Sequence, residues 1–179
     1  MRAKLKRSQK PTGYLSSGTG TLGNLVAESW ARKDKIKLAH IASRGTITAL
    51  TSPAAIGVLS STTVLTESRN NTVIPLAVSS ARRMPQFPDA PTLKELGYAD
   101  LVATNWSILS APAALPTEIR DKLNSAVAAV LDAPIVAARL ERWGMFTEKM
   151  SPDELTAFVE AELRKWVPLV SRAAGGPAR

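Results

Sequence analysis

The chain has 179 residues, of which 45% are hydrophobic, and this is enough for one globular domain with a core of its own. It contains no cysteine and a single histidine, so disulfides, thiolate metal sites and multi-histidine metal sites are excluded. No apolar run reaches the length of a membrane-spanning helix.

The net charge of +8 is concentrated in the first quarter of the chain. Residues 1–44 contain ten Lys and Arg and two acidic residues, whereas the remainder is balanced. A basic segment can bind nucleic acid or anionic lipid, or it can be a solvated tail. Only Tyr14 and Trp30 are available nearby for base stacking, which favours a tail, and we expect residues 1–13 to form a basic disordered arm. The arm does not resemble a signal peptide, because it runs into Pro11 instead of an apolar segment.

A turn of small residues follows the arm. Tyr14 and Leu15 are typical of the end of a strand, and 22–32 has the apolar spacing of a helix. A glycine-rich turn that opens a helix presents backbone N–H groups at the positive end of the helix dipole, where a carboxylate or phosphate can bind. The pattern is neither a P-loop nor GxGxxG, so an anion site and a well-capped turn both remain open. The candidate residues are Ser16, Ser17, Gly18, Thr19, Gly20 and Thr21.

The next segments carry weaker signals. Residues 36–41 alternate as a strand does, with Ser43 in its exit turn and His40 near its end. His40 can face a ligand or form a half-buried hydrogen bond, and both interpretations remain open. We expect a short strand at 56–59 and a short helix at 62–66.

Two β-prone runs enclose a proline-rich excursion. Residues 73–78 predict a buried strand, and 101–109 predict a second one. Between them Thr92 can cap a single helical turn that Gly97 ends. Two strands joined in this way are suited to cross between two lobes.

The last third of the chain predicts helices. Pro116 stands at an expected first helical residue, Asp132 at an expected N-cap, and Gly144 at an expected helix end. Ser151 and Glu154 form a capping-box pattern before a helix with a long apolar stripe, which must pack on a large surface.

The order of these elements resembles the extracytoplasmic solute receptors of tripartite tricarboxylate transporters, also called Bug-type receptors. The resemblance covers about residues 14–175. Its motifs are SSGTGT, LAVSSARR, FPDAPTLKELGY, NWSILSAPAALPTEIRDKLNSAV and SPDELTAFVEAELRKW.

This resemblance implies an α/β, periplasmic-binding-protein-like (type II-like) lobe with C-terminal helices, and a first lobe that is largely missing. The implied organisation is an arm at 1–13, a ligand-binding lobe at 14–110 with crossing strands near 73–78 and 101–109, and a helical segment at 111–175 that packs on the other lobe in the family. It also implies a small carboxylate solute held by the turn with His40 and Ser43, membrane transporter subunits as partners, a periplasmic location and no cofactor or metal.

The chain also departs from the family pattern. Family members precede the turn with a signal peptide and most of the first lobe, and Asn24 stands where a histidine is common. We therefore expect a truncated receptor with weakened or lost binding, which would stay in the cytoplasm if expressed as written. Its uncovered C-terminal helices would favour self-association.

Two alternatives stand beside a receptor: a fragment without a binding role, and a basic nucleic-acid-binding module, although no nucleic acid is expected. An enzyme is not expected, because the one histidine is followed by no nucleophile elbow.

Overall fold

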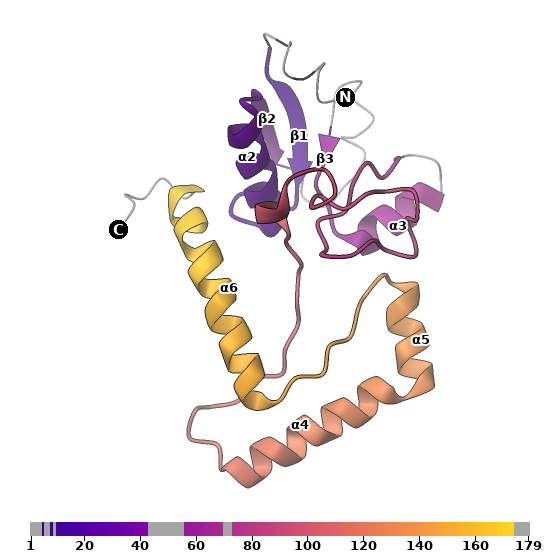
Figure 1. The fold of residues 1–179 in the computed structure, drawn as a ribbon, viewed down its shortest axis with the longest axis vertical. Helices are drawn as coiled ribbons and strands as arrows, with labels where there is room; N and C mark the ends of the chain where they lie inside the picture. Colours follow the sequence, from indigo (N-terminus) through magenta and orange to yellow (C-terminus); the bar gives the residue numbers. More distant parts are fainter. Residues whose placement is uncertain (1–4, 6–7, 9, 43–55, 70–72, 174–179) are drawn as a thin grey trace. The chain divides into compact units, whose positions relative to one another are not determined.

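The computed structural model of the chain describes residues 5, 8, 10–42, 56–69 and 73–173. The chain divides into two compact units (Figure 1). The first comprises residues 1–105 together with 170–179, and the second comprises 106–169.

A small parallel sheet is the centre of the first unit. Its strands lie in the order β2-β1-β3, with Tyr14 opposite both His40 and Ile56 in the register. Central position in the sheet explains why Tyr14, Leu15 and Ser16 are almost fully buried. The strands are β1 (Thr12–Ser16), β2 (Leu38–Ala42) and β3 (Ile56–Gly57).

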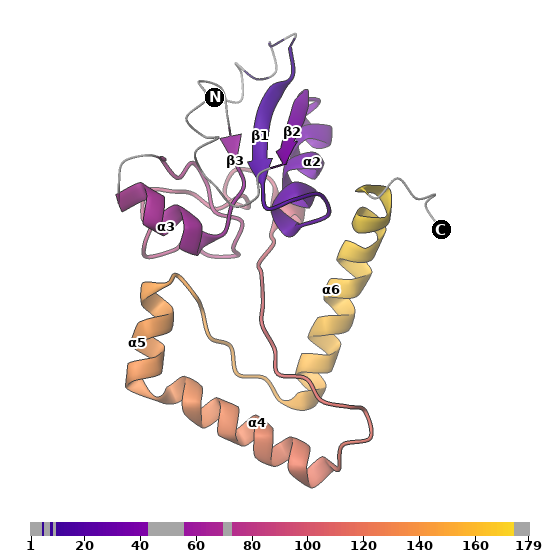
Figure 2. The same cartoon turned by 180° about the vertical axis from the view of Figure 1, so that it is seen from behind.

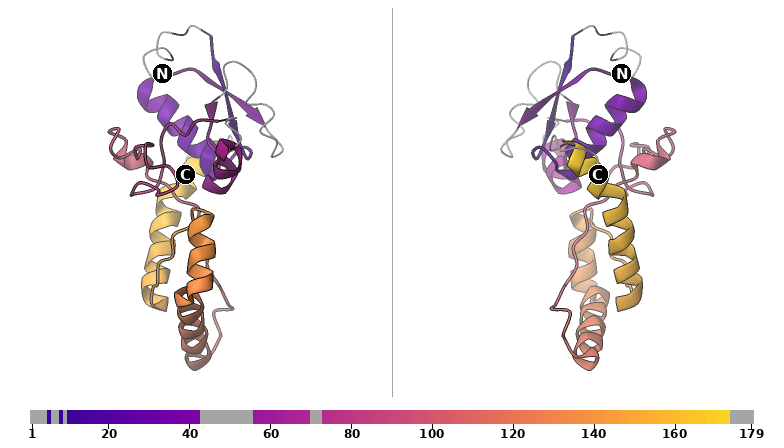
Figure 3. Two further views of the ribbon diagram at one scale, coloured as in Figure 1. Left: turned by 90° about the vertical axis from the view of Figure 1, so that its right-hand side faces the viewer. Right: turned by 90° about the vertical axis from the view of Figure 1, so that its left-hand side faces the viewer.

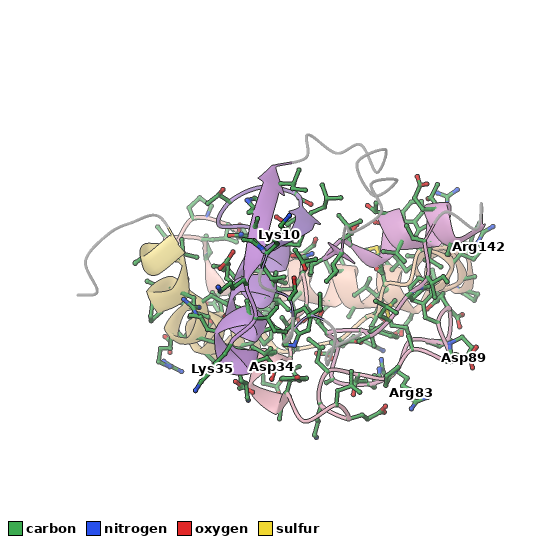
Figure 4. All side chains as sticks on the ribbon, turned by 90° about the horizontal axis from the view of Figure 1, so that it is seen from above. Lys10, Asp34, Lys35, Arg83, Asp89 and Arg142 are labelled. Carbon is green, nitrogen blue, oxygen red and sulfur yellow. The ribbon has the colours of Figure 1, made fainter. Side chains whose placement is uncertain are left out.

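Helix α2 (Leu22–Asp34) connects β1 to β2 and packs alongside both, as the side views in Figure 3 also show. Its buried face includes Leu25, Val26 and Ala31, in agreement with the predicted apolar stripe. Lys35 adopts a left-handed φ of 54° and ends the helix, and Ile36 N–H then donates to Ala31 O at 2.9 Å. Asp34 and Lys35 mark this end in Figure 4.

The proline-rich excursion forms a small core of its own, made by Val78, Met84, Phe87 and Ala90 against helix α3 (Ser61–Arg69). The expected helical turn is present within it. Thr92 Oγ1 accepts the Glu95 N–H at 3.0 Å, Glu95 Oε2 accepts the Thr92 N–H at 3.3 Å, and Gly97 ends the turn with φ of 88°. A short 3₁₀ helix, η2 (Ala99–Leu101), follows.

The prediction of strands at 73–78 and 101–109 is wrong. In the first run Ile74 is 81% exposed, and only Val78 pairs, as an isolated bridge with Thr92. Pro75 removes one backbone donor from that run, so a continuous ladder is unfavourable there. Ser79, the residue after the first run, nevertheless contacts the second run: Ala103 N–H donates to Ser79 O at 2.8 Å and Ser79 Oγ donates to Ala103 O at 2.7 Å.

The predicted arm at 1–13 also needs correction at its end. Thr12 and Gly13 belong to β1, and Thr12 N–H donates to Lys37 O at 3.0 Å. Of the first nine residues, only Leu5 and Ser8 are among those described. The division of the chain into lobes with boundaries near 110 and 175 stays a prediction.

The second unit is helical, and Figure 2 shows its helices from behind. Ser151 and Glu154 form the predicted capping box, with Ser151 N–H donating to Glu154 Oε2 at 2.8 Å. Asp132 does not cap a helix as predicted, because the N-cap of α5 is Ala133, and Pro116 is an N-cap instead of a first helical residue. The helices are α4 (Thr117–Asp132), α5 (Pro134–Arg142) and α6 (Pro152–Ala173), the last of which continues into the first unit.

The apolar residues of α4 and α5 are not buried. No residue of either helix is buried, and Leu123 and Val130 are among the exposed ones. In the described part of the chain no single helix has the length and apolarity to span a membrane. Helices α4 and α5 pass such a test only as a pair, with a bend of 71° between them.

Candidate functional site

The predicted small-residue turn connects β1 to α2 and requires glycine at two positions. Gly18 has φ of 137° and Gly20 has φ of 77°, both in the region that side chains disfavour. Thr21 Oγ1 donates to Gly18 O at 2.7 Å and closes the turn. Leu25 N–H then donates to Thr21 O at 2.9 Å, which begins the helical hydrogen bonding of α2. The backbone at this end of α2 carries the positive end of the helix dipole.

Ser16, the last residue of β1, contacts His40 in the middle of the neighbouring strand β2. Ser16 Oγ and His40 Nε2 are 2.8 Å apart, and the same hydroxyl accepts the Gly18 N–H at 3.3 Å. The His40 ring also lies on Tyr14, with centroids 5.0 Å apart. Ser16 has no solvent exposure, so its hydroxyl holds the turn against β2 and is out of reach for attack on a substrate.

Two residues of α2 that were not predicted as site residues support the turn through Tyr14. Asn24 and Glu28 lie one helical turn apart on α2 and both reach the hydroxyl of Tyr14 on β1. Asn24 Oδ1 in turn accepts the Gly20 N–H at 2.9 Å. The sequence did contain a signal for them: Tyr14 and Ser16 are two apart on a strand, and Asn24 and Glu28 are four apart on a helix, so each pair shares a face.

The hydroxyl of Tyr14 is held in its neutral form. Burial raises its pKa well above the ordinary value of a tyrosine, and the hydrogen bond to the Glu28 carboxylate raises it further. The phenol proton therefore stays on Tyr14, whose hydroxyl donates it in a hydrogen bond to Glu28 Oε1 with an oxygen–oxygen distance of 2.5 Å.

The predicted site residues thus fall into three groups. Ser16, Gly18, Thr21 and His40 are joined by hydrogen bonds, and Gly20 belongs to the same turn but is bonded to Asn24. Ser17 and Thr19 are exposed on the turn. Ser43 lies outside the described residues.

The turn offers hydrogen-bond donors without a charged side chain of its own. Among the described residues, no group of three His, Asp or Glu side chains is arranged to hold a metal ion. A separate open hollow of about 420 Å³ belongs to the second unit and is lined by Glu148, Lys149, Met150 and Glu154. Its two carboxylates make it unsuitable for an anion.

Comparison with known families gives a match over nearly the whole chain. The family described as "Tripartite tricarboxylate transporter family receptor" matches residues 3–174. A relative from a Pseudomonas species, the "UPF0065 protein in tcbD-tcbE intergenic region", is 28% identical over 93% of this chain and 52% of its own length. "Protein BugT" of Bordetella pertussis is 30% identical over 60% of this chain and 33% of its own length. The chain spans about half the length of the first of these relatives and a third of the second.

A solved structure shares the fold. The structure "R. palustris Rpa4515 with adipate" superposes with a TM-score of 0.75 at 24% identity, over 97% of this chain and 59% of that one. The predicted α/β, periplasmic-binding-protein-like fold is confirmed by this likeness.

Proposed function

Because this chain belongs to the tripartite tricarboxylate transporter family of receptors, we propose that it binds a small carboxylated solute at the turn between β1 and α2. Members of this family are solute-binding receptors and not enzymes. Similar proteins are described as periplasmic, and we propose the same location and a membrane transporter as the partner of this chain.

One observation carries the proposal: two glycines with positive φ shape an open turn at the start of a helix of 13 residues. A carboxylate placed there would meet backbone donors and the exposed hydroxyls of Ser17 and Thr19. The structural relative Rpa4515 is described with adipate, a dicarboxylate, which supports this class of solute.

His40 would complete the site from the neighbouring strand. Its Nε2 bonds Ser16 and the residue is partly exposed, and we propose that the exposed part of its ring contacts the solute. Ser43, the last member of the proposed site, follows β2 in the chain.

The proposal can be tested by substituting two glycines that have similar backbone conformation, one in the turn and one outside it. Gly20 and Gly97 both have positive φ, 77° and 88°, and an added Cβ would meet no atom within 4 Å at either one. Gly20→Ala and Gly97→Ala should therefore destabilise the fold by similar amounts, about 1–2 kcal/mol. Only Gly20→Ala should weaken binding of adipate, measured by calorimetry well below the melting temperature of each variant.

Two results would contradict the proposal. One is unchanged affinity in Gly20→Ala. The other is no binding by the unsubstituted chain across a panel of mono-, di- and tricarboxylates, which would favour a receptor fragment without a binding role. The nucleic-acid alternative is not favoured, because the family match extends through the basic segment from residue 3 onwards.

We also propose that the helices of the second unit mediate self-association. The support is the exposure of their apolar side chains, including Ile135 at 78% and Leu163 at 55%.

A further inference from the structure

A continuous chain of hydrogen bonds connects the proposed anion turn to a carboxylate on the side of α2. Gly20 N–H donates to Asn24 Oδ1 at 2.9 Å, Asn24 Nδ2 donates to Tyr14 OH at 2.6 Å, and Tyr14 OH donates to Glu28 Oε1 at 2.5 Å. Tyr14 has no solvent exposure and Asn24 is 3% exposed, so water cannot replace these partners.

The direction of this chain is fixed at the Glu28 end. An ionised carboxylate only accepts hydrogen bonds, so the one O–H of Tyr14 must donate to Glu28. The Tyr14 oxygen can then only accept, and the amide nitrogen of Asn24 is the group that donates to it. The amide oxygen of Asn24 consequently faces the Gly20 N–H. In the flipped orientation the Asn24 NH₂ group would face that N–H, and two donors would oppose each other.

We propose that Asn24 is a positioning residue for the solute site, and that Glu28 orients it through Tyr14. The inference rests on the proposed carboxylate-binding function of the turn. Asn24 holds the Gly20 amide inward, so that amide shapes the turn instead of binding the solute. The positive φ of Gly20 is thereby maintained before a solute arrives.

Asn24→Asp is the decisive substitution because it keeps the shape of the side chain. An aspartate can still accept the Gly20 N–H, but its second oxygen and Glu28 then compete for the one proton of Tyr14. One of two adjacent carboxylates would be left without a donor in a buried site, and the turn should loosen. Glu28→Gln should loosen the turn less than Asn24→Asp does. The glutamine oxygen can still accept the hydrogen bond from Tyr14, but its NH₂ group can also donate to Tyr14, so the direction of the hydrogen bonds is no longer fixed.

Tyr98→Phe is the matched control for Tyr14→Phe. Each tyrosine is buried and donates at 2.5 Å to a carboxylate of α2, Tyr98 to Asp34 and Tyr14 to Glu28. Tyr14 is connected to the turn through Asn24, whereas the described hydrogen bond of Tyr98 is to Asp34 at the opposite end of α2. Both substitutions should lower the melting temperature, whereas only Tyr14→Phe should change the hydrogen-exchange protection of the Gly20 amide.

The primary measurement is hydrogen exchange of the Gly20 amide by NMR, with the Val58 amide, which donates to Leu15 O at 2.9 Å, as an internal reference. In Asn24→Asp and Tyr14→Phe residue 24 loses its hydrogen bond with Tyr14, so we expect protection of Gly20 to fall about tenfold relative to Val58, the effect of one hydrogen bond of ordinary net strength on the position of that side chain. Tyr98→Phe should leave that ratio unchanged. Calorimetry with adipate on the same samples should show weaker binding in the first two variants only.

Unchanged Gly20 protection in both Asn24→Asp and Tyr14→Phe would overturn the inference. Loss of protection with unchanged adipate affinity would overturn the link to binding. If the unsubstituted chain binds no carboxylate while Gly20 still loses protection, the proposed function fails and Asn24 is supported as the residue that positions the turn.

Discussion

The hydroxyl of Tyr14 is the point where the strand, the helix and the turn of the first unit are joined. It accepts from Asn24 and donates to Glu28, and its ring stacks against His40. Burial at this position makes ionisation of the phenol unfavourable in the folded state, which couples folding to pH at the alkaline end.

We expect the free energy of unfolding to fall as pH rises above about 10, where tyrosine ionises in an unfolded chain. The pKa of Tyr14 is raised in the folded state, chiefly by burial and next by Glu28, so its stabilising contribution is complete below that pH and is lost above it. Urea unfolding at several alkaline pH values would measure the slope. The free energy of unfolding of Tyr14→Phe should fall less steeply with pH than that of the unsubstituted chain. Tyr98→Phe, measured in the same way, shows how removal of another buried tyrosine hydroxyl of this unit changes the slope. Equal slopes in the unsubstituted chain and Tyr14→Phe would contradict the assignment to Tyr14.

Sequence reasoning located part of the candidate site and missed its support. A glycine-rich turn before a helix has a local signature, so the positive φ at Gly18 and Gly20 could be anticipated. Ser16 is paired with Ala42 and His40 with Tyr14, so the contact between Ser16 and His40 is a diagonal one between side chains on the same face of adjacent parallel strands. Asn24 and Glu28 were not predicted because their contact with Tyr14 depends on how α2 rotates over the sheet, which periodicity does not determine.

At the scale of elements, the first turn of α2 lies directly against the chain that leaves β3. An added Cβ on Gly23 would collide with the backbone carbonyl of Val58. Val58 cannot move away easily, because its N–H donates to Leu15 O at 2.9 Å and extends the pairing of β1 with β3. Gly23, the second residue of α2, is therefore restricted by packing and not by φ.

Gly23→Ala should destabilise the fold even though alanine is the better helix former. Propensity favours alanine by about 1 kcal/mol, whereas forcing a methyl group against fixed backbone costs about 1–3 kcal/mol or more. Thermal unfolding should show a lower melting temperature. Ser29→Ala, at a partly exposed position of the same helix, is the control and should be neutral or slightly stabilising. A stabilised Gly23→Ala variant would show that the Val58 backbone can move away from the added methyl group.

Helices were predicted better than strands for a physical reason. An amphipathic stripe and a cap are local, and α4, the Ser151–Glu154 cap and the Thr92 turn were all recognised from them. A strand exists only if a neighbour pairs with it. The runs at 73–78 and 101–109 have strand composition, but their pairing is limited to the Val78–Thr92 bridge and to the contact between Ser79 and Ala103.

At the scale of the whole molecule, the fold class was predictable because the order of elements was preserved along the chain. The two units differ in how they bury apolar residues. The first has a sheet with buried side chains such as Leu15 and Leu25, and the second places most of its apolar side chains at the surface. In the second unit Trp106 packs edge-on to Phe158 with ring centroids 5.7 Å apart. The Nε1–H groups of Trp106 and Trp166 both donate to Glu162.

The exposed apolar face of α4 leads to a prediction about assembly. Its residues follow helical spacing, so they form one stripe, and apolar stripes of this kind on soluble proteins usually mark interaction surfaces. We expect the chain to self-associate, with a mass above that of the monomer by light scattering after size-exclusion chromatography. The stripe consists of Ile119, Leu123, Val127 and Val130.

A charge placed on the stripe should shift the chain toward monomer without unfolding it. Leu123→Glu puts a carboxylate at the centre of the exposed face, where it would be desolvated by a second copy but remains hydrated in a monomer. Ser125→Glu introduces the same charge on the opposite side of α4 and should leave the mass distribution unchanged. Sedimentation velocity over a range of concentrations distinguishes the two variants. Because neither side chain is buried, equal melting temperatures would show that a change in mass reflects the surface and not the fold; a concentration-independent monomer in the unsubstituted chain would exclude association through α4.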